Sequence, residues 1–186
     1  MRKYGILTAV IVCVTVLSVT LWSLMAPSAH AAGKFETMIE GRRVEMSFSF
    51  VADREGRRYS GNGTVHYQDG RYTFTSNGLR VYNDTKEMWT VDDNAREAVV
   101  QWGTSTNFLA SPKDMITLFG FNASGAVIQP QYNADGTPKS YSVTLRDGTK
   151  LSVLIPSVKI LPKGDTDGFS FDRHTLDSSY VITDMR

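Results

Sequence analysis

The chain has 186 residues with 20 basic and 19 acidic side chains, and 41% of its residues are hydrophobic. This charge balance argues against nucleic-acid binding, which calls for a basic face, and the length suits one domain with a sizeable core. The single cysteine, Cys13, lies in an N-terminal apolar run, so the rest of the chain has no disulfide, thiol nucleophile or thiolate metal site.

The N-terminus predicts an export signal at residues 1–31. Two basic residues precede an uncharged run from Tyr4 to Met25, and the triplet Ala29-His30-Ala31 then presents small residues at the two positions that a signal peptidase reads. We therefore expect cleavage after Ala31 and a single exported domain at 32–186. The apolar run is also long enough to be kept as a membrane anchor, which leaves a tethered domain as the alternative.

The segment after the signal predicts a short helix and then a strand. Phe35, Met38 and Ile39 recur at helical spacing within residues 33–40, so this piece should lie with its apolar side on a sheet. Residues 42–52 instead alternate, which is the period of a strand with one buried face. The apolar positions of this strand are Val44, Met46, Phe48 and Phe50.

Consecutive hairpins are predicted from residue 61 to residue 102. Asp69-Gly70 and Asn77-Gly78 supply the positive φ angles that a two-residue type I′ turn requires. Two further strands, at 86–91 and 95–102, complete the meander, and Gly61-Asn62-Gly63 is expected to permit a bulge or a bend. Such a sheet must bury its apolar face against another layer or a ligand.

A short helix is predicted in the middle of the chain. Ser111 is a hydroxyl N-cap, Pro112 occupies the first helical position, and Asp114 places an acid at the third. Gly120 should end the helix. A helix of about two turns cannot persist in water unless its apolar side is packed, so we expect this one to lie on the sheet.

The C-terminal third predicts more antiparallel strands. They should span 127–132, 139–146 and 150–155, with a tight turn at Asp147-Gly148 between the last two. Pro156 and Pro162 suit an edge position, because proline cannot donate to a neighbouring strand. The remaining tail should form short extended pieces around an irregular loop.

Several loose motifs carry a likeness to a known family. They are the strand Gly63-Thr64-Val65-His66-Tyr67 with the following Arg71-Tyr72-Thr73-Phe74, the strand from Lys86 to Val91 with its tryptophan, and the tail from Phe169 to Arg186. In the order of these elements, over nearly all of residues 33–186, the chain resembles the outer-membrane lipoprotein carrier (LolA-like) family.

The resemblance implies a mainly β fold: a strongly curved antiparallel sheet, an incomplete and unclosed β-barrel, with short helices as a lid over its concave apolar face. It also implies a periplasmic carrier that binds acyl chains of lipoproteins, or another lipid, between an inner-membrane release complex and an outer-membrane acceptor. The residues expected to line the cavity are Phe48, Phe50, Val65, Tyr67, Tyr72, Phe74, Trp89 and Val91. Those expected to form the lid are Phe35, Met38, Ile39, Met115, Ile116, Leu118 and Phe119.

The chain departs from the family at one position. Family members commonly carry an Arg-Pro step after the second strand, where the arginine helps to latch the lid, whereas this sequence has Asp69-Gly70. Arg71 is near but falls on a different pleat. A lipid or lipoprotein binder that is gated in another way therefore fits the sequence equally well.

Patterns of catalytic or metal-binding residues do not stand out. His66 and His174 are about a hundred residues apart, and the sequence has no Gly-x-Ser-x-Gly and no recognisable metal spacing. We expect a monomeric non-enzyme without cofactor or metal. The competing hypothesis is a non-catalytic exported β-sandwich that serves as an interaction module, in which residues such as Tyr72 and Trp89 belong to an ordinary filled core.

Overall fold

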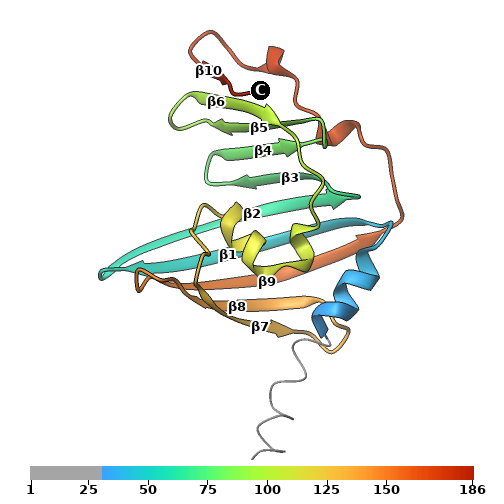
Figure 1. The fold of residues 1–186 in the computed structure, drawn as a ribbon, viewed down its shortest axis with the longest axis vertical. Coiled ribbons are helices and arrows are strands. Elements are labelled where there is room, and N and C mark those ends of the chain that lie inside the picture. Colours follow the sequence, from blue (N-terminus) through green and yellow to red (C-terminus); the bar gives the residue numbers. More distant parts are fainter. Residues whose placement is uncertain (1–30) are drawn as a thin grey trace, which may run out of the picture.

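The computed structural model describes residues 31–186, and Figure 1 shows their arrangement. The predicted signal peptide lies outside the described residues, apart from Ala31, which is helical. Within this range, no helix is both long and apolar enough to cross a membrane.

The described chain forms one sheet of ten strands, in the order β10-β6-β5-β4-β3-β2-β1-β9-β8-β7. The alternation and the tight turns seen in the sequence explain the long run of neighbouring antiparallel pairs. The strands are β1 (Arg43–Arg54), β2 (Arg57–Gln68), β3 (Arg71–Ser76), β4 (Leu79–Asn83), β5 (Glu87–Asp92), β6 (Glu97–Trp102), β7 (Val127–Tyr132), β8 (Pro138–Thr144), β9 (Lys150–Leu161) and β10 (Val181–Asp184).

The sheet is antiparallel except at one edge and does not close. Strands β1 to β6 form a meander, β9 returns to pair with β1, and β10 adds to β6 in parallel. The two edges of this sheet are β7 and β10. The prediction of a mainly β, mostly antiparallel and unclosed sheet with short helices is confirmed, and the described residues form one sheet rather than the two of a sandwich.

A bulge or a bend was predicted at Gly61-Asn62-Gly63. There is no bulge in the pairing of β2 with β1, which keeps a regular register throughout. The two glycines instead make room for aromatic rings on the neighbouring strand. A Cβ on Gly61 would come within 2.7 Å of the Phe50 ring, and one on Gly63 within 2.6 Å of the Phe48 ring. Each phenylalanine ring therefore covers the glycine that is its cross-strand partner.

The expected edge position of Pro156 is also wrong, because β9 lies between β1 and β8. The register of the β1 and β9 pair shifts between Ser47 and Ser49, where Ser47 faces Ser157 and Ser49 faces Leu154. Pro156 falls within this irregularity, where a residue without an N–H is tolerated inside a sheet.

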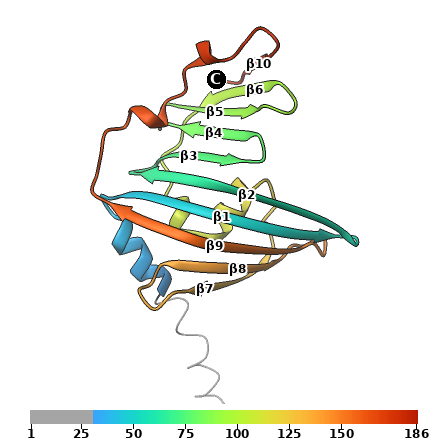
Figure 2. The same cartoon turned by 180° about the vertical axis from the view of Figure 1, so that it is seen from behind.

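The helices lie on one side of the sheet (Figure 1), and the view from behind shows the strands in front of them (Figure 2). Residues 31–39 are helical, close to the predicted 33–40. The middle helix α2 (Pro112–Leu118) follows a short 3-10 turn, η1 (Phe108–Ala110). Its predicted N-cap is confirmed, because the hydroxyl of Ser111 accepts a hydrogen bond from the backbone N–H of Asp114 at 3.2 Å.

The two faces of the sheet have separate apolar clusters. The lid face, on which Phe48, Phe74 and Val81 lie, packs against the N-terminal helix, η1 and α2. On the tail face, Trp89 and its neighbours pack against the C-terminal segment, which contains the 3-10 turns η2 (Asp167–Phe169) and η3 (Arg173–Thr175). That segment runs from the end of β9, inside the sheet, to β10 at one of its edges (Figure 2).

Candidate functional site

The centre of the lid face is a group of stacked aromatic rings closed by Phe119, the residue after α2. Its ring lies 4.4 Å from the Phe48 ring, 5.8 Å from the Phe74 ring and 6.3 Å from the Phe50 ring, between centroids. Met115 and Ile116 of α2 are fully buried beside it. The lid thus fills the middle of the sheet with side chains from a helix of two turns.

The segment that leads from β6 to the lid is held by one buried side chain, Asn83. Its amide nitrogen donates to the carbonyls of Gly70 at 3.3 Å and Thr104 at 2.6 Å. Its oxygen accepts from the backbone N–H groups of Thr104 at 3.3 Å and Thr85 at 3.2 Å. The Asp69-Gly70 turn is packed against this segment, because a Cβ on Gly70 would meet Ser105. Sequence reasoning missed Asn83, whose only signal is a polar residue at an inward position of β4.

An apolar groove of about 440 Å³ lies between the lid and strands β3 to β5. Its polar groups come from Tyr72, three threonines and Asp114. The Tyr72 hydroxyl donates to the Met88 sulfur at 3.1 Å, and burial raises the pKa of that hydroxyl. Such a mixture of mostly apolar lining and a few fixed polar groups is typical of ligand pockets. The groove is lined by Tyr72, Leu79, Val81, Met88, Thr90, Thr106, Phe108, Asp114, Thr117 and Leu118.

Most residues expected at the cavity and the lid do meet on the lid face. Of the expected cavity residues, those in or packed against this cluster are Phe48, Phe50, Val65, Tyr67, Tyr72 and Phe74. Of the expected lid residues, those in or packed against it are Phe35, Ile39, Met115, Ile116, Leu118 and Phe119. Met38 is only half-buried.

The placement of Trp89 and Val91 on the cavity wall is wrong. Trp89 pairs with Tyr82, whereas Val81 of the lid face pairs with Thr90, so the side chains of Trp89 and Val91 point to the tail face. There the Trp89 ring lies 5.2 Å from the Phe171 ring. The positions of β5 that face the lid are occupied by Met88 and Thr90, which line the groove instead.

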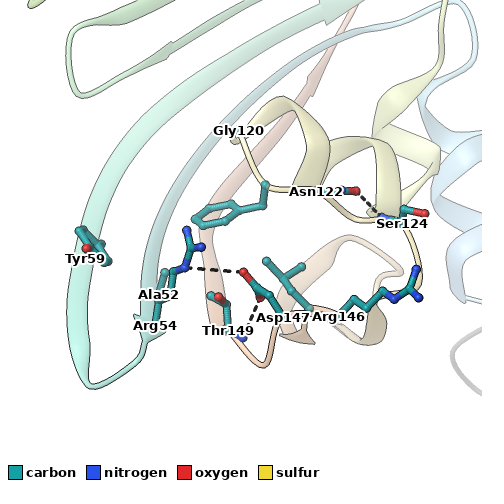
Figure 3. A pocket seen from close by; sticks show the side chains of 11 residues that line it. Ala52, Arg54, Tyr59, Gly120, Asn122, Ser124, Arg146, Asp147 and Thr149 are labelled. Carbon is teal, nitrogen blue, oxygen red and sulfur yellow. Dashed lines mark hydrogen bonds and ion pairs between the residues drawn. The ribbon is translucent and has the colours of Figure 1, made fainter.

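A second pocket, of about 630 Å³, lies at the other flank of the lid, beyond Gly120 (Figure 3). It is bounded by the end of the β1–β2 hairpin, the segment 120–124 and the turn between β8 and β9. In it, Arg54 forms an ion pair with Asp147 at 3.7 Å. A hydrogen bond from the backbone N–H of Thr149, at 3.0 Å, lowers the pKa of Asp147.

The described residues contain no group of three or more histidine, cysteine, aspartate or glutamate side chains that could hold a metal ion. His66 lies 3.7 Å from Glu45, side chain to side chain, on strands β2 and β1. His174 is exposed in η3, in the tail. The two histidines are therefore not brought together.

The fold resembles that of a solved structure. A crystal structure of an uncharacterized conserved protein from Thermus thermophilus matches with a TM-score of 0.51 at 6% sequence identity, over 84% of this chain and 98% of that chain. This likeness shows the fold alone. A DUF1329 family protein from Desulfovibrio piger matches with a TM-score of 0.45 at 10% identity, over 81% of this chain and 98% of that chain. No model of a known family matches the sequence, and no curated protein does.

Proposed function

We propose that this chain is a non-enzymatic periplasmic carrier that binds the acyl chain of a lipoprotein, or of another lipid, between the lid and the sheet. The observation that carries the proposal is the way the lid face is covered. The seven-residue helix α2 ends just before Phe119, whose ring packs into the aromatic cluster on the sheet. An apolar groove lies beside this lid. A helix this short gains its stability from packing and can be displaced as a unit.

The energies of such an exchange are close to balanced. Burying an acyl chain gains about 0.8 kcal/mol per methylene, so roughly a dozen methylenes gain on the order of 10 kcal/mol. Undocking a buried phenylalanine costs about 3–5 kcal/mol, and Met115 and Ile116 add to this cost. The gain and the cost are therefore of similar size, which suits a carrier that must also release its cargo.

The LolA-like resemblance supports the same function and suggests how its gate differs. Where the family commonly has an arginine latch, this chain has the Asp69-Gly70 turn, and that turn lies against the segment leading to the lid. The Asn83 side chain donates hydrogen bonds to Gly70 of the turn and to Thr104 of the segment. We infer that Asn83 replaces the arginine as the latch, and that the cargo passes from an inner-membrane donor to an outer-membrane acceptor, as the family implies.

The decisive experiment is mass spectrometry of lipid that copurifies with the protein from periplasm without detergent. We expect stoichiometric acylated cargo, and N-terminal sequencing of the same sample should begin at Ala32. Recombinant protein should bind a fluorescent fatty acid, and Leu79→Gln in the groove should weaken binding, while Thr73→Gln on the other face of the sheet should not. A protein that carries no lipid and binds no fatty acid would instead be an interaction module with a filled core.

A further inference from the structure

The pocket beyond Gly120 differs in character from the groove beside the lid, because three charged side chains line it: Arg54, Arg146 and Asp147 (Figure 3). Its apolar wall consists of Ala52, Phe121 and Leu145, with Tyr59 at the outer end. Its polar residues are Arg54, Asn122, Ser124, Arg146, Asp147 and Thr149. A site with one apolar wall and one polar rim fits an amphiphilic molecule.

The rim has a surplus of positive charge. Two arginines and one carboxylate line the pocket. Arg54 pairs with Asp147 at 3.7 Å, whereas the guanidinium of Arg146 points away from Asp147 (Figure 3), which leaves the charge of Arg146 in excess. The side chains of Arg54 and Asp147 are 62% and 49% exposed, so their ion pair is weak and Arg54 can turn to another anion. An arginine offers a planar fork of donors that matches a carboxylate or a phosphate.

The same pocket contains a polar group without a partner. Thr149 is 3% exposed, and its hydroxyl has no hydrogen-bond partner among the described residues. The hydroxyl lies near the carboxylate of Asp147 but outside hydrogen-bonding geometry. Buried hydroxyls are nearly always satisfied, so an unpaired one at a pocket wall calls for an explanation.

The pocket is continuous with the aromatic cluster under the lid. The Phe121 ring meets the Phe50 ring edge-on at 5.9 Å, and the Phe50 ring stacks on that of Phe119 at 6.3 Å. A chain that enters beside Phe121 and displaces Phe119 would therefore run along one unbroken apolar surface.

We propose that this pocket binds the anionic head, a carboxylate or a phosphate, of an amphiphile whose hydrocarbon chain lies under the lid, with Arg146 and Arg54 as the cations and the hydroxyl of Thr149 as a donor. The inference rests on the proposed carrier function and adds to it the charge and the orientation of the cargo. The head lies at the tip of the β1–β2 hairpin, and the chain points toward Phe119.

The test compares dodecanoate with dodecanol, which share a chain and differ in the head. Each is titrated against protein loaded with the uncharged dye Nile red, at a pH where the carboxylate is ionised. Wild type should bind dodecanoate about two- to fivefold more tightly than dodecanol, which is what a partly exposed charge contact provides. Arg146→Gln should remove most of this preference by lowering the affinity for dodecanoate more than that for dodecanol. Arg146→Lys should restore part of it, and Thr149→Val should reduce it.

Lys139→Gln is the matched control, because Lys139 is an exposed cation on β8 that does not line the pocket, and it should keep the full preference. Equal affinity for the two probes in wild type, or a preference that survives Arg146→Gln, overturns the inference while the carrier function stands. Binding of neither probe overturns the carrier function as well. Inorganic phosphate should leave the preference intact at millimolar concentration; if it abolishes the preference, the site is one for a free oxyanion and the inference is wrong.

Discussion

The ring of Phe119 stacks on that of Phe48 at 4.4 Å between centroids, with 24° between the ring planes. Phe48 in turn covers Gly63, its cross-strand partner in β2. Gly63, the Phe48 ring and the Phe119 ring therefore lie one on another. Of these three, only Phe119 belongs to the lid segment and can leave the sheet with it.

Replacing Phe119 tests directly whether the lid competes with the cargo for the aromatic cluster. Phe119→Ser should lower the free energy of unfolding of the empty protein by about 3 kcal/mol, because it leaves a cavity and an unpaired hydroxyl in the aromatic cluster. Affinity for a fluorescent fatty acid should stay the same or rise, since the cargo no longer competes with the ring. Urea unfolding and probe titration measure the two effects.

Phe171→Ala is the control for this experiment. It removes an aromatic ring from the tail face, where Phe171 packs on Trp89 and Tyr82. It should lower stability while leaving probe affinity at the wild-type value. If Phe119→Ser binds the probe more weakly while its free energy of unfolding stays at the wild-type value, this segment does not act as a lid.

The wall of the site is tested by Phe74→Asp, which should abolish probe binding because a carboxylate would face the acyl chain. Thr75→Asp, the neighbouring position on the exposed opposite side of β3, should bind normally, and Phe74→Leu should retain most of the affinity. Circular dichroism establishes that each variant folds. If Phe74→Asp folds and binds the probe as well as wild type, the cavity lies elsewhere.

Asn83→Ala should loosen the segment between β6 and the lid. The variant loses four hydrogen bonds and leaves backbone groups of Gly70 and Thr104 unpaired, at a cost of about 3 kcal/mol. Hydrogen exchange should become faster in residues 104–119 and binding of the probe should be quicker. Asn94→Ala, which removes an exposed bond to the carbonyl of Asn77, should change neither rate; an unchanged exchange rate in Asn83→Ala would exclude the latch role.

The tail should make stability depend on pH through Asp93. Hydrogen bonds from Arg80, at 2.7 and 3.0 Å, and from the Tyr180 hydroxyl, at 2.7 Å, hold the pKa of Asp93 below its usual 3.8. Because the folded pKa is the lower one, the carboxylate stabilises the fold above the unfolded pKa, and this contribution is lost as the pH falls through the folded value.

Tyr180→Phe should therefore narrow the difference in Tm between about pH 7 and about pH 3. Tyr59→Phe, at an exposed tyrosine of β2, should show the wild-type difference. A Tyr180→Phe protein with an unchanged pH dependence would show that this hydroxyl does not stabilise the carboxylate.

Local signals predicted most of the fold. The Asp-Gly and Asn-Gly turns and the strict alternation of Val44 to Phe50 depend only on neighbouring residues, and so does the cap at Ser111. Pro156 was misread because its tolerance depends on a bulge between β9 and β1, strands that are far apart in the chain.

The site was predicted less well, for a related reason. Strand β5 carries apolar residues on both faces, Met88 on one and Trp89 on the other, so alternation alone cannot decide which face is the cavity. The answer depends on the tail, which brings Phe171 to the far face. Asn83 was missed because its partners are backbone groups, which have no signature in the sequence.

The pairing of β1 with β9 has a consequence for the order of assembly. It joins Arg43 to Leu161, so the centre of the sheet cannot close until nearly all of the chain is available, whereas the meander needs only neighbouring segments. During that interval the apolar side of the meander lacks its final neighbours. Of the elements that follow the meander in the chain, the lid segment is the first that can cover that side, because it precedes β7. We therefore expect α2 to protect the half-formed sheet from aggregation while the chain folds.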